Sequence, residues 1–232
     1  AKTTATIEII MTRFNITTVS ENKKVAEQAD VLFLAVKPIF LSEVIEEIKD
    51  VVRPETLIVS IAAGRTLAYL REAFGRPELK LVRCMPNTPA LVMEGCTGIC
   101  AGADVTEEEL QRIVGLMEAF GKASVVPERL MDVVVGVSGS SPAYVFMFIE
   151  AMADEAVAAG MPRKQAYEFA AQSVLGSAKM VLETGKHPGE LKDMVCSPGG
   201  TTIEAVKVLE EKGFRAAVMD AMEACIEKSK NM

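Results

Sequence analysis

Short apolar runs alternate with helical patterns through the first half of the chain. The runs at 30–38 and 56–64 are almost continuously hydrophobic, which is typical of strands buried on both faces of a sheet. Shorter runs at 80–90, which breaks at Pro86, at 97–102 and at 123–127 predict three further strands. This alternation predicts an α/β fold with a mostly parallel, doubly wound sheet and helices on its faces.

The segments between these strands carry apolar residues at helical spacing. They predict amphipathic helices at 40–52, at about 66–74, and from Thr106 to Phe120. Thr106 and Glu109 have the spacing of a capping box, which marks the start of the third helix.

After Pro127 the strand pattern stops and only helical patterns remain. Gly160 and Gly185 are expected to end helices, and Pro162 to begin one. The predicted helices span 128–159 (loosened near 136–142), 162–184, 188–195, 202–211 and 214 to about 228. We therefore expect two domains, residues 1–126 and residues 127–232, with the boundary near 126.

Composition and charge narrow the classes of partner. Half of the 232 residues are hydrophobic but only 5% are aromatic and none is Trp, so the core must be built from Ala, Val, Leu, Ile and Met. The net charge of −7 and the scattered Lys and Arg residues argue against binding to nucleic acid or to an anionic membrane. The apolar runs are about strand length, so no segment is expected to span a bilayer, and no signal peptide is apparent.

The cysteines and the single histidine argue against a metal site. Cys96 and Cys100 are separated by three residues with no histidine nearby, and five cysteines in all suggest reduced thiols in the cytoplasm. His187 is the only histidine and follows Gly185 at a helix end. A capping or surface role is favoured for it over general acid catalysis.

Three predicted strands end in unusual segments. The stretch 35–38 (AVKP) offers small residues, the cation Lys37 and the rigid turn of Pro38, and the stretch 62–64 (AAG) again offers small side chains. The stretch 85–89 (MPNTP) supplies Asn87 between two prolines. Each alone is explained by the needs of a turn. Together, at the carboxyl edge of one sheet, they predict a ligand-binding edge.

The stretch 195–202 (VCSPGGTT) interrupts the helical half with two glycines, a proline and three hydroxyl side chains. Thr201 and Glu204 have capping-box spacing, so a capped helix after a glycine turn is one interpretation. The other is a binding loop. Gly199 and Gly200 would let backbone N–H groups converge on a small carboxylate, and Ser197, Thr201 and Thr202 would add hydroxyl groups.

In this order, the motifs resemble those of the pyrroline-5-carboxylate reductase family. The residues that carry the resemblance include ADVLFLAVKP (29–38), RCMPNTPA (83–90), GVSGSSPAYVF (136–146) and GSAKMVLETGKHPGELKDMVCSPGGTTIEAV (176–206). The likeness covers roughly residues 14–232 and is most specific at 185–210. It implies an NAD(P)-binding Rossmann domain followed by a helical domain for dimerisation and substrate binding, in homodimers that assemble further.

The resemblance also implies which residues touch each ligand. Ser197, Gly200, Thr201 and Thr202 would hold the substrate together with Gly199, and Thr202 would hydrogen-bond the ring nitrogen. Glu128 would face the substrate pocket. The positions expected to contact NADP or NAD are Asn22, Ala35, Val36, Lys37, Ala63 and Asn87, with Pro38 and Ala62 beside them.

One departure from the family is large. The sequence contains no G-x-G-x-x-G, the turn that cradles the pyrophosphate of a dinucleotide. The unit that carries this turn, roughly 30 residues long, is expected to have been deleted or left out of the sequence. Omission is favoured, because a sheet without its central strand should expose apolar surface. The missing unit also contains the region that selects NADP or NAD, so the sequence does not predict which of the two is preferred.

The implied activity is hydride transfer from NAD(P)H to the C=N carbon of 1-pyrroline-5-carboxylate, which gives L-proline. No His–Asp dyad is visible, so the substrate would arrive protonated, or Thr202 and water would relay a proton. Two alternatives stay open: a related imine or hydroxy-acid reductase on the same scaffold, and a non-catalytic oligomeric protein that binds a ligand.

Overall fold

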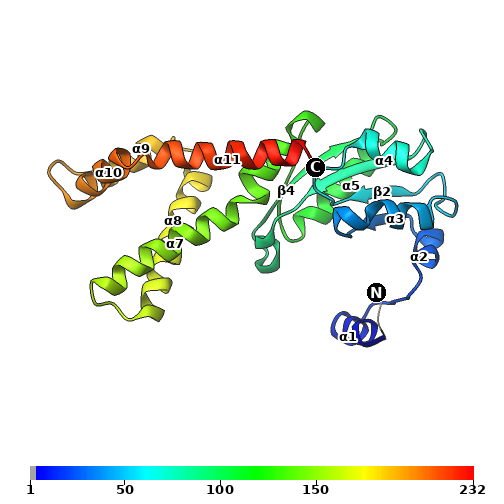
Figure 1. The fold of residues 1–232 in the computed structure, drawn as a ribbon, viewed down its shortest axis with the longest axis horizontal. Helices are drawn as coiled ribbons and strands as arrows, with labels where there is room; N and C mark the ends of the chain where they lie inside the picture. The colour runs from blue at the N-terminus through cyan, green and yellow to red at the C-terminus, as the bar shows by residue number, and fades with distance from the viewer. Residues whose placement is uncertain (1–3) are drawn as a thin grey trace. The chain divides into compact units, whose positions relative to one another are not determined.

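The computed structural model describes residues 4–232. Its contacts divide the chain into two compact units (Figure 1). The first unit runs to Gly139 and also includes Cys225–Met232, and the second is Ser140–Ala224. The sequence pattern predicted a boundary between two functional domains near residue 126. This boundary stays a prediction, because the two units are defined by contacts and not by function.

The first unit contains a five-stranded sheet whose strands are adjacent in chain order. The strands are β1 (Val31–Leu34), β2 (Leu57–Ser60), β3 (Lys80–Met85), β4 (Gly95–Ala101) and β5 (Gly121–Val125). Only β3 and β4 are antiparallel. They are joined by the short 3-10 helix η1 (Thr88–Val92), whereas each parallel pair is joined by a helical crossover. The predicted mostly parallel sheet is confirmed.

Three helices of the first unit follow the predicted pattern with shifted ends, namely α3 (Pro38–Ile48), α4 (Leu67–Phe74) and α5 (Glu107–Glu118). Two more, α1 (Thr4–Phe14) and α2 (Asn22–Gln28), were not predicted from the sequence. Helix α3 begins earlier than expected because Pro38, whose missing N–H costs nothing there, occupies its first position. The capping box of Thr106 and Glu109 is formed in full.

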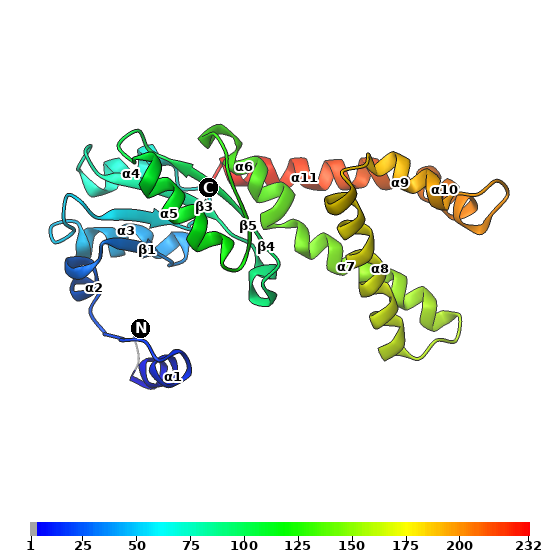
Figure 2. The ribbon, with the colours of Figure 1, turned by 180° about the vertical axis from the view of Figure 1, so that it is seen from behind.

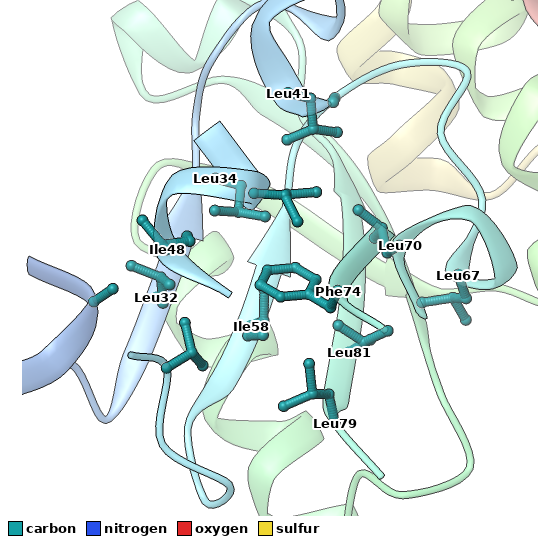
Figure 3. Close-up of a cluster of buried hydrophobic side chains, with 14 of the residues drawn as sticks. Leu32, Leu34, Leu41, Ile48, Ile58, Leu67, Leu70, Phe74, Leu79 and Leu81 are labelled. Atoms are coloured by element: carbon teal, nitrogen blue, oxygen red, sulfur yellow. The ribbon is translucent and has the colours of Figure 1, made fainter. Parts of the chain in front are cut away.

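Two layers of apolar side chains cover the two faces of the sheet. Leu32, Ile58 and Leu81 point to the face covered by α3 and α4, where Figure 3 shows the packed cluster. Val59, Val82 and Ile99 point to the opposite face, covered by α5, which lies nearer the viewer in Figure 2. The core is aliphatic as expected, with Phe74, Cys84 and Cys100 as additions.

Residues 128–158 form one helical stretch with a local irregularity. It comprises η2 (Glu128–Leu130), α6 (Met131–Val134), a π-helical turn η3 (Val135–Gly139) and α7 (Ser141–Ala158). The π turn accounts for the predicted loosening near 136–142. By length and composition alone, Glu128–Ala158 is apolar enough to cross a membrane, and only 6% of its most apolar window is buried. The expectation that no apolar segment is longer than a strand is therefore wrong. It considered only continuous apolar runs, whereas this helix has many apolar residues interrupted by small polar ones.

The second unit is helical and has almost no core of its own. After α7 it contains α8 (Arg163–Thr184), α9 (Pro188–Val195), α10 (Thr201–Glu211) and most of α11 (Phe214–Lys230). Helices α7 and α8 lie side by side (Figures 1 and 2). Between residues 140 and 224, the only buried apolar side chains are Ala153, Ala166 and Ala170.

The last turns of α11 belong to the first unit. Ser229 is 3% exposed, and its hydroxyl donates to Asp132 Oδ1 at 2.6 Å. Gly64 shows how closely the chain end approaches, since a Cβ at Gly64 would lie 2.6 Å from Cβ of Met232. The end of the chain thus packs beside the loop that follows β2.

Candidate active site

The carboxyl ends of β1, β2 and β3 meet at one edge of the sheet. The strands are parallel and in register, with Leu34 paired to Ser60 and Ser60 paired to Arg83. The segments that follow these strands therefore lie next to one another. All the positions predicted to contact the cofactor after a strand are on these segments, at the edge where α/β sheets bind their ligands.

The first of these segments begins directly after β1. Ala35 and Lys37 are exposed, Val36 is half-buried and Pro38 opens α3. Ala35 and Val36 line a small cavity of about 100 Å³ together with Asn22, the first residue of α2. The structure therefore brings three of the predicted cofactor residues together.

The second segment, after β2, is packed more tightly. Ala62 is 6% exposed and belongs to the core, while Ala63 is half-buried. The backbone N–H of Ala62 donates to the Ser60 hydroxyl at 3.3 Å, and Gly64 has φ +69°. The small side chains here allow close packing, and Ala63 is the more exposed of the two alanines.

The third segment follows β3 and contains Asn87. Its side-chain Nδ2 donates to the carbonyl oxygen of Ser138 at 3.0 Å, and its Oδ1 accepts from the backbone N–H of Cys96 at 2.8 Å. The side chain predicted to contact the cofactor thus also joins β4 to the π-helical turn. This structural task was not visible in the sequence.

Glu128 lies where three elements meet. Its Oε1 accepts from the backbone N–H of Leu67 at 2.7 Å and from Arg83 Nη1 at 2.8 Å. Arg83 is 6% exposed and sits in the middle of β3. Sequence reasoning missed Arg83, although one arginine within the apolar run LVRCM is a sign of a buried ionic partner.

The loop between α9 and α10 contains a tight turn. The Gly200 N–H donates to the Ser197 carbonyl oxygen at 3.0 Å, and Gly199 has φ +67°. With Pro198 second and glycine third, this is the residue pattern of a type II turn. A Cβ at Gly200 would lie 2.5 Å from Ser197 Oγ. Local geometry therefore accounts for the proline and both glycines.

The predicted capping box of Thr201 and Glu204 is wrong. Helix α10 begins at Thr201, its N-cap is Gly200, and no side chain caps it. Because the helix starts one residue earlier than expected, Thr201 lies inside the first turn and its hydroxyl is not at the capping position. Within residues 4–232, the hydroxyls of Ser197, Thr201 and Thr202 have no hydrogen-bond partner. Capping does not explain these three side chains.

The capping role predicted for His187 is confirmed. It is the N-cap of α9, and its Nδ1 accepts from the Gly189 N–H at 3.0 Å. In the described part of the chain, no group of three His, Cys, Asp or Glu side chains is placed to hold a metal ion. None of the five cysteines, all of which lie within the described residues, forms a disulfide bond, and burial raises the pKa of the Cys84 thiol from 9.0 to about 12.

The fold and the family matches define the class of the protein. Residues 2–64 match the family described as "NADP oxidoreductase coenzyme F420-dependent", and residues 128–232 match "Pyrroline-5-carboxylate reductase dimerisation". Together with the small-residue carboxyl edge of the sheet, these matches identify an NAD(P)H-dependent oxidoreductase.

Individual relatives narrow the class. The chain is 58% identical over 220 residues to a pyrroline-5-carboxylate reductase of Escherichia coli, covering 95% of this chain and 81% of that one. The solved Coxiella burnetii pyrroline-5-carboxylate reductase superposes with a TM-score of 0.91 at 33% identity, covering 99% and 86% of the two chains. The Plasmodium falciparum pyrroline carboxylate reductase, solved with NADP bound, gives a TM-score of 0.86 at 34% identity, covering 92% and 80%. The chain belongs to the pyrroline-5-carboxylate reductase family.

Proposed function

We propose that the protein reduces 1-pyrroline-5-carboxylate to L-proline with NAD(P)H, the last step of proline biosynthesis. The observation that carries this proposal is the 58% identity to the Escherichia coli reductase over 95% of the chain. The unpartnered hydroxyls at the start of α10 agree with it, because they are suited to a small polar ligand and have no structural use within the described residues.

The carboxyl edge of the sheet fits a dinucleotide. Small or half-buried residues, Ala35, Val36 and Ala63, leave room for a flat ring or a ribose, and among the described residues Asn22 is the one polar residue that lines the small apolar cavity it shares with the first two. We assign Asn22, Ala35, Val36, Lys37, Pro38, Ala62, Ala63 and Asn87 to the cofactor site. When bound, NADPH or NADH supplies the hydride that reduces the C=N bond.

The loop before α10 fits the carboxylate of the substrate. The first N–H groups of a helix have no intrahelical partner and carry partial positive charge, and Gly199 and Gly200 leave the approach to them open. Ser197 and Thr201 would add hydroxyl donors. Thr202 would hold the ring nitrogen, and Glu128 would face the substrate through Oε2, since its Oε1 is already shared by two donors.

The proton for the ring nitrogen has to come through a short route. We assign no role in the proton transfer to His187, whose Nδ1 caps α9 by accepting from the Gly189 N–H. A protonated substrate needs no further donor, and otherwise the Thr202 hydroxyl with water would deliver the proton. In either case the main task of the protein is to position substrate and cofactor against each other.

We also propose that the protein works as a homodimer that assembles into a larger homo-oligomer. The second unit buries only three alanines as apolar side chains and exposes large ones, among them Phe146, Met147, Phe169, Leu182 and Met219. A unit with so little core needs a partner surface, and a second copy is the occupant that the dimerisation family supports. We propose that this surface, with the apolar helix 128–158, meets another subunit and not a membrane.

Two further assignments accompany this function. The functional domains are residues 1–126 for the cofactor and 127–232 for dimerisation and substrate, a division supported by the family match that begins at residue 128. Five cysteines without a disulfide bond among them support a reducing compartment, so we propose that the protein works in the cytoplasm.

The direct test is oxidation of NADPH and of NADH by the full-length protein with 1-pyrroline-5-carboxylate, followed by nicotinamide absorbance, with proline measured as the product. A panel of other cyclic imines and of keto acids serves as the control. We expect proline formation with 1-pyrroline-5-carboxylate as the best substrate. Turnover of another imine with no proline formed would overturn the proposal.

A further inference from the structure

A partly buried ionic contact links the sheet to Glu128. Arg83 is almost fully buried, and its guanidinium Nη1 donates to Glu128 Oε1 at 2.8 Å, while the Glu128 side chain is 36% exposed. Removing Glu128 would leave the buried Arg83 charge without compensation, which is costly. The pair therefore holds the Glu128 carboxylate in one position.

The same carboxylate oxygen also holds the first residue of α4. Glu128 Oε1 accepts from the backbone N–H of Leu67 at 2.7 Å. This N–H belongs to the first turn of the helix, where a negative charge is stabilising. Thr66 caps the same turn by accepting from the Tyr69 N–H at 3.0 Å. The start of α4 is thus fixed by one local contact and one from a residue 61 positions away.

The loop between β2 and α4 is consequently held at both ends. At one end is Ser60, whose strand is paired on both sides, and at the other is Leu67 on the Glu128 carboxylate. The loop carries Ala62 and Ala63, two of the residues assigned to the cofactor. Its Arg65 lies over the ring of Tyr69 at 4.7 Å, so the loop also folds against α4.

We propose that Arg83 and Glu128 form a positioning pair that sets the β2–α4 loop for cofactor binding. Arg83 contacts neither the cofactor nor the substrate. It acts through Glu128, which in turn fixes the helix start that ends the loop. The proposal rests on the proposed function in one respect only, namely that this loop contacts NAD(P)H.

The test compares Arg83→Met and Arg83→Lys with a control on the same strand. Lys80, at the other end of β3, pairs with Glu109 Oε1 at 2.5 Å and lies away from the loop, so Lys80→Met removes a comparable ion pair. The dissociation constant of NADPH is measured by calorimetric titration of the full-length protein. The KM values for both substrates, kcat and Tm are measured alongside.

Arg83→Met is expected to weaken NADPH binding and to raise the NADPH KM by about tenfold or more, with a smaller change in the KM of the imine. The dissociation constant and KM of NADPH for Lys80→Met are expected to stay within about twofold of the wild-type values. This should hold even if the Tm of Lys80→Met falls as much as that of Arg83→Met. Arg83→Lys keeps the charge and should recover part of the loss. Glu128→Gln keeps an oxygen that can accept from the Leu67 N–H but loses the negative charge. Its NADPH affinity should therefore lie between those of the wild type and Arg83→Met.

The proposal is overturned if Arg83→Met binds NADPH as the wild type does, or if it loses only kcat in proportion to its folded fraction. If Arg83→Met does not fold, the decision passes to Arg83→Lys and Glu128→Gln. If both of these variants bind NADPH as tightly as the wild type, the proposal is also overturned. Failure of the proposed function would look different, because the wild-type protein would then bind NADPH without reducing 1-pyrroline-5-carboxylate.

Discussion

The side-chain amide of Asn87 donates a hydrogen bond to the backbone carbonyl oxygen of Ser138, 3.0 Å away. The two residues are 51 positions apart, and Ser138 belongs to the π-helical turn η3. Through its other atom, Asn87 also accepts from the Cys96 N–H. One side chain thus connects the segment after β3, the start of β4 and the π turn, all within the first unit.

Replacing Asn87 with alanine removes one hydrogen bond from each of two backbone groups, the Ser138 carbonyl oxygen and the Cys96 N–H. We expect Asn87→Ala to lower the free energy of unfolding by about 1–3 kcal/mol, the range for half-buried polar groups that lose a partner. Urea unfolding followed by circular dichroism measures this. Asn87→Asp keeps the acceptor for Cys96 but turns a carboxylate oxygen toward the Ser138 carbonyl. A stability equal to that of the wild type for Asn87→Asp would contradict this role of the amide.

We expect different roles for Thr202, in the first turn of α10, and His187, the N-cap of α9. We expect Thr202→Ala to lower kcat by about a hundredfold, the scale of one lost donor to a transition state. His187→Ala removes only a cap and should cost about 1 kcal/mol of stability, with kcat nearly unchanged. Steady-state kinetics and thermal unfolding of both variants separate the two effects. Equal losses of kcat would refute the role of Thr202.

The turn before α10 depends on its two glycines in different ways. Gly199 has φ +67° and no neighbour that a Cβ would meet, so Gly199→Ala is expected to cost about 1 kcal/mol through backbone strain alone. At Gly200 a Cβ would push Ser197 Oγ away, with Ser197 O at 3.1 Å behind it. Gly200→Ala should therefore raise the KM of the imine more than Gly199→Ala does. The reverse order would show that the Ser197 hydroxyl does not contact substrate.

Short-range rules predicted most of the elements, and the reasons are visible at particular residues. The capping box of Thr106 and Glu109 forms because both partners lie within one turn. Thr201 and Glu204 have the same spacing, yet no box forms, because Gly200 takes the N-cap position. The spacing alone does not say where a helix begins when a glycine turn precedes it.

Other contacts of the site and of the fold join residues that are distant in the sequence. Arg83 and Glu128 are 45 positions apart, and Ser229 and Asp132 are 97 apart. Neither contact can be recognised from the spacing of residues in the sequence, because each depends on how strands and helices pack. The resemblance supplied candidate contacts, and the structure added that Asn87 and Glu128 are also held by protein partners.

The buried thiols should make stability fall in alkaline solution. Burial raises the pKa of Cys84 from 9.0 to about 12 and that of Cys100 from 9.0 to about 11. In the unfolded chain both thiols ionise near 9.0, while in the folded chain they stay neutral. Their contribution to stability is thus complete below pH 9.0 and is lost as the pH rises toward the folded values. Unfolding midpoints of the wild type and of Cys84→Ala across this range measure it. A slope that is unchanged in the variant would contradict the prediction.

The same burial predicts the order in which the cysteines react. Cys96 is exposed, whereas Cys84 and Cys100 are buried and neutral at ordinary pH. Because the thiolate is the nucleophile, iodoacetamide should modify Cys96 well before Cys84 or Cys100 in the folded protein. Peptide mass spectrometry over a time course measures the order. Early modification of Cys84 without loss of the fold would contradict the burial.

The exposed apolar side chains of the helical unit predict that a second subunit covers them. Phe169 on α8 is 62% exposed, in a unit whose buried apolar side chains are three alanines. If a second subunit covers this face, Phe169→Glu places a charge in the interface and should dissociate the oligomer, lowering Tm and making it depend on protein concentration. Leu116→Glu is the control, since Leu116 lies on α5 of the first unit and is 43% exposed. Sedimentation velocity should show smaller species for Phe169→Glu and wild-type assembly for Leu116→Glu. Identical assembly in both variants would mean that α8 faces solvent, and that the helical unit finds its missing core elsewhere.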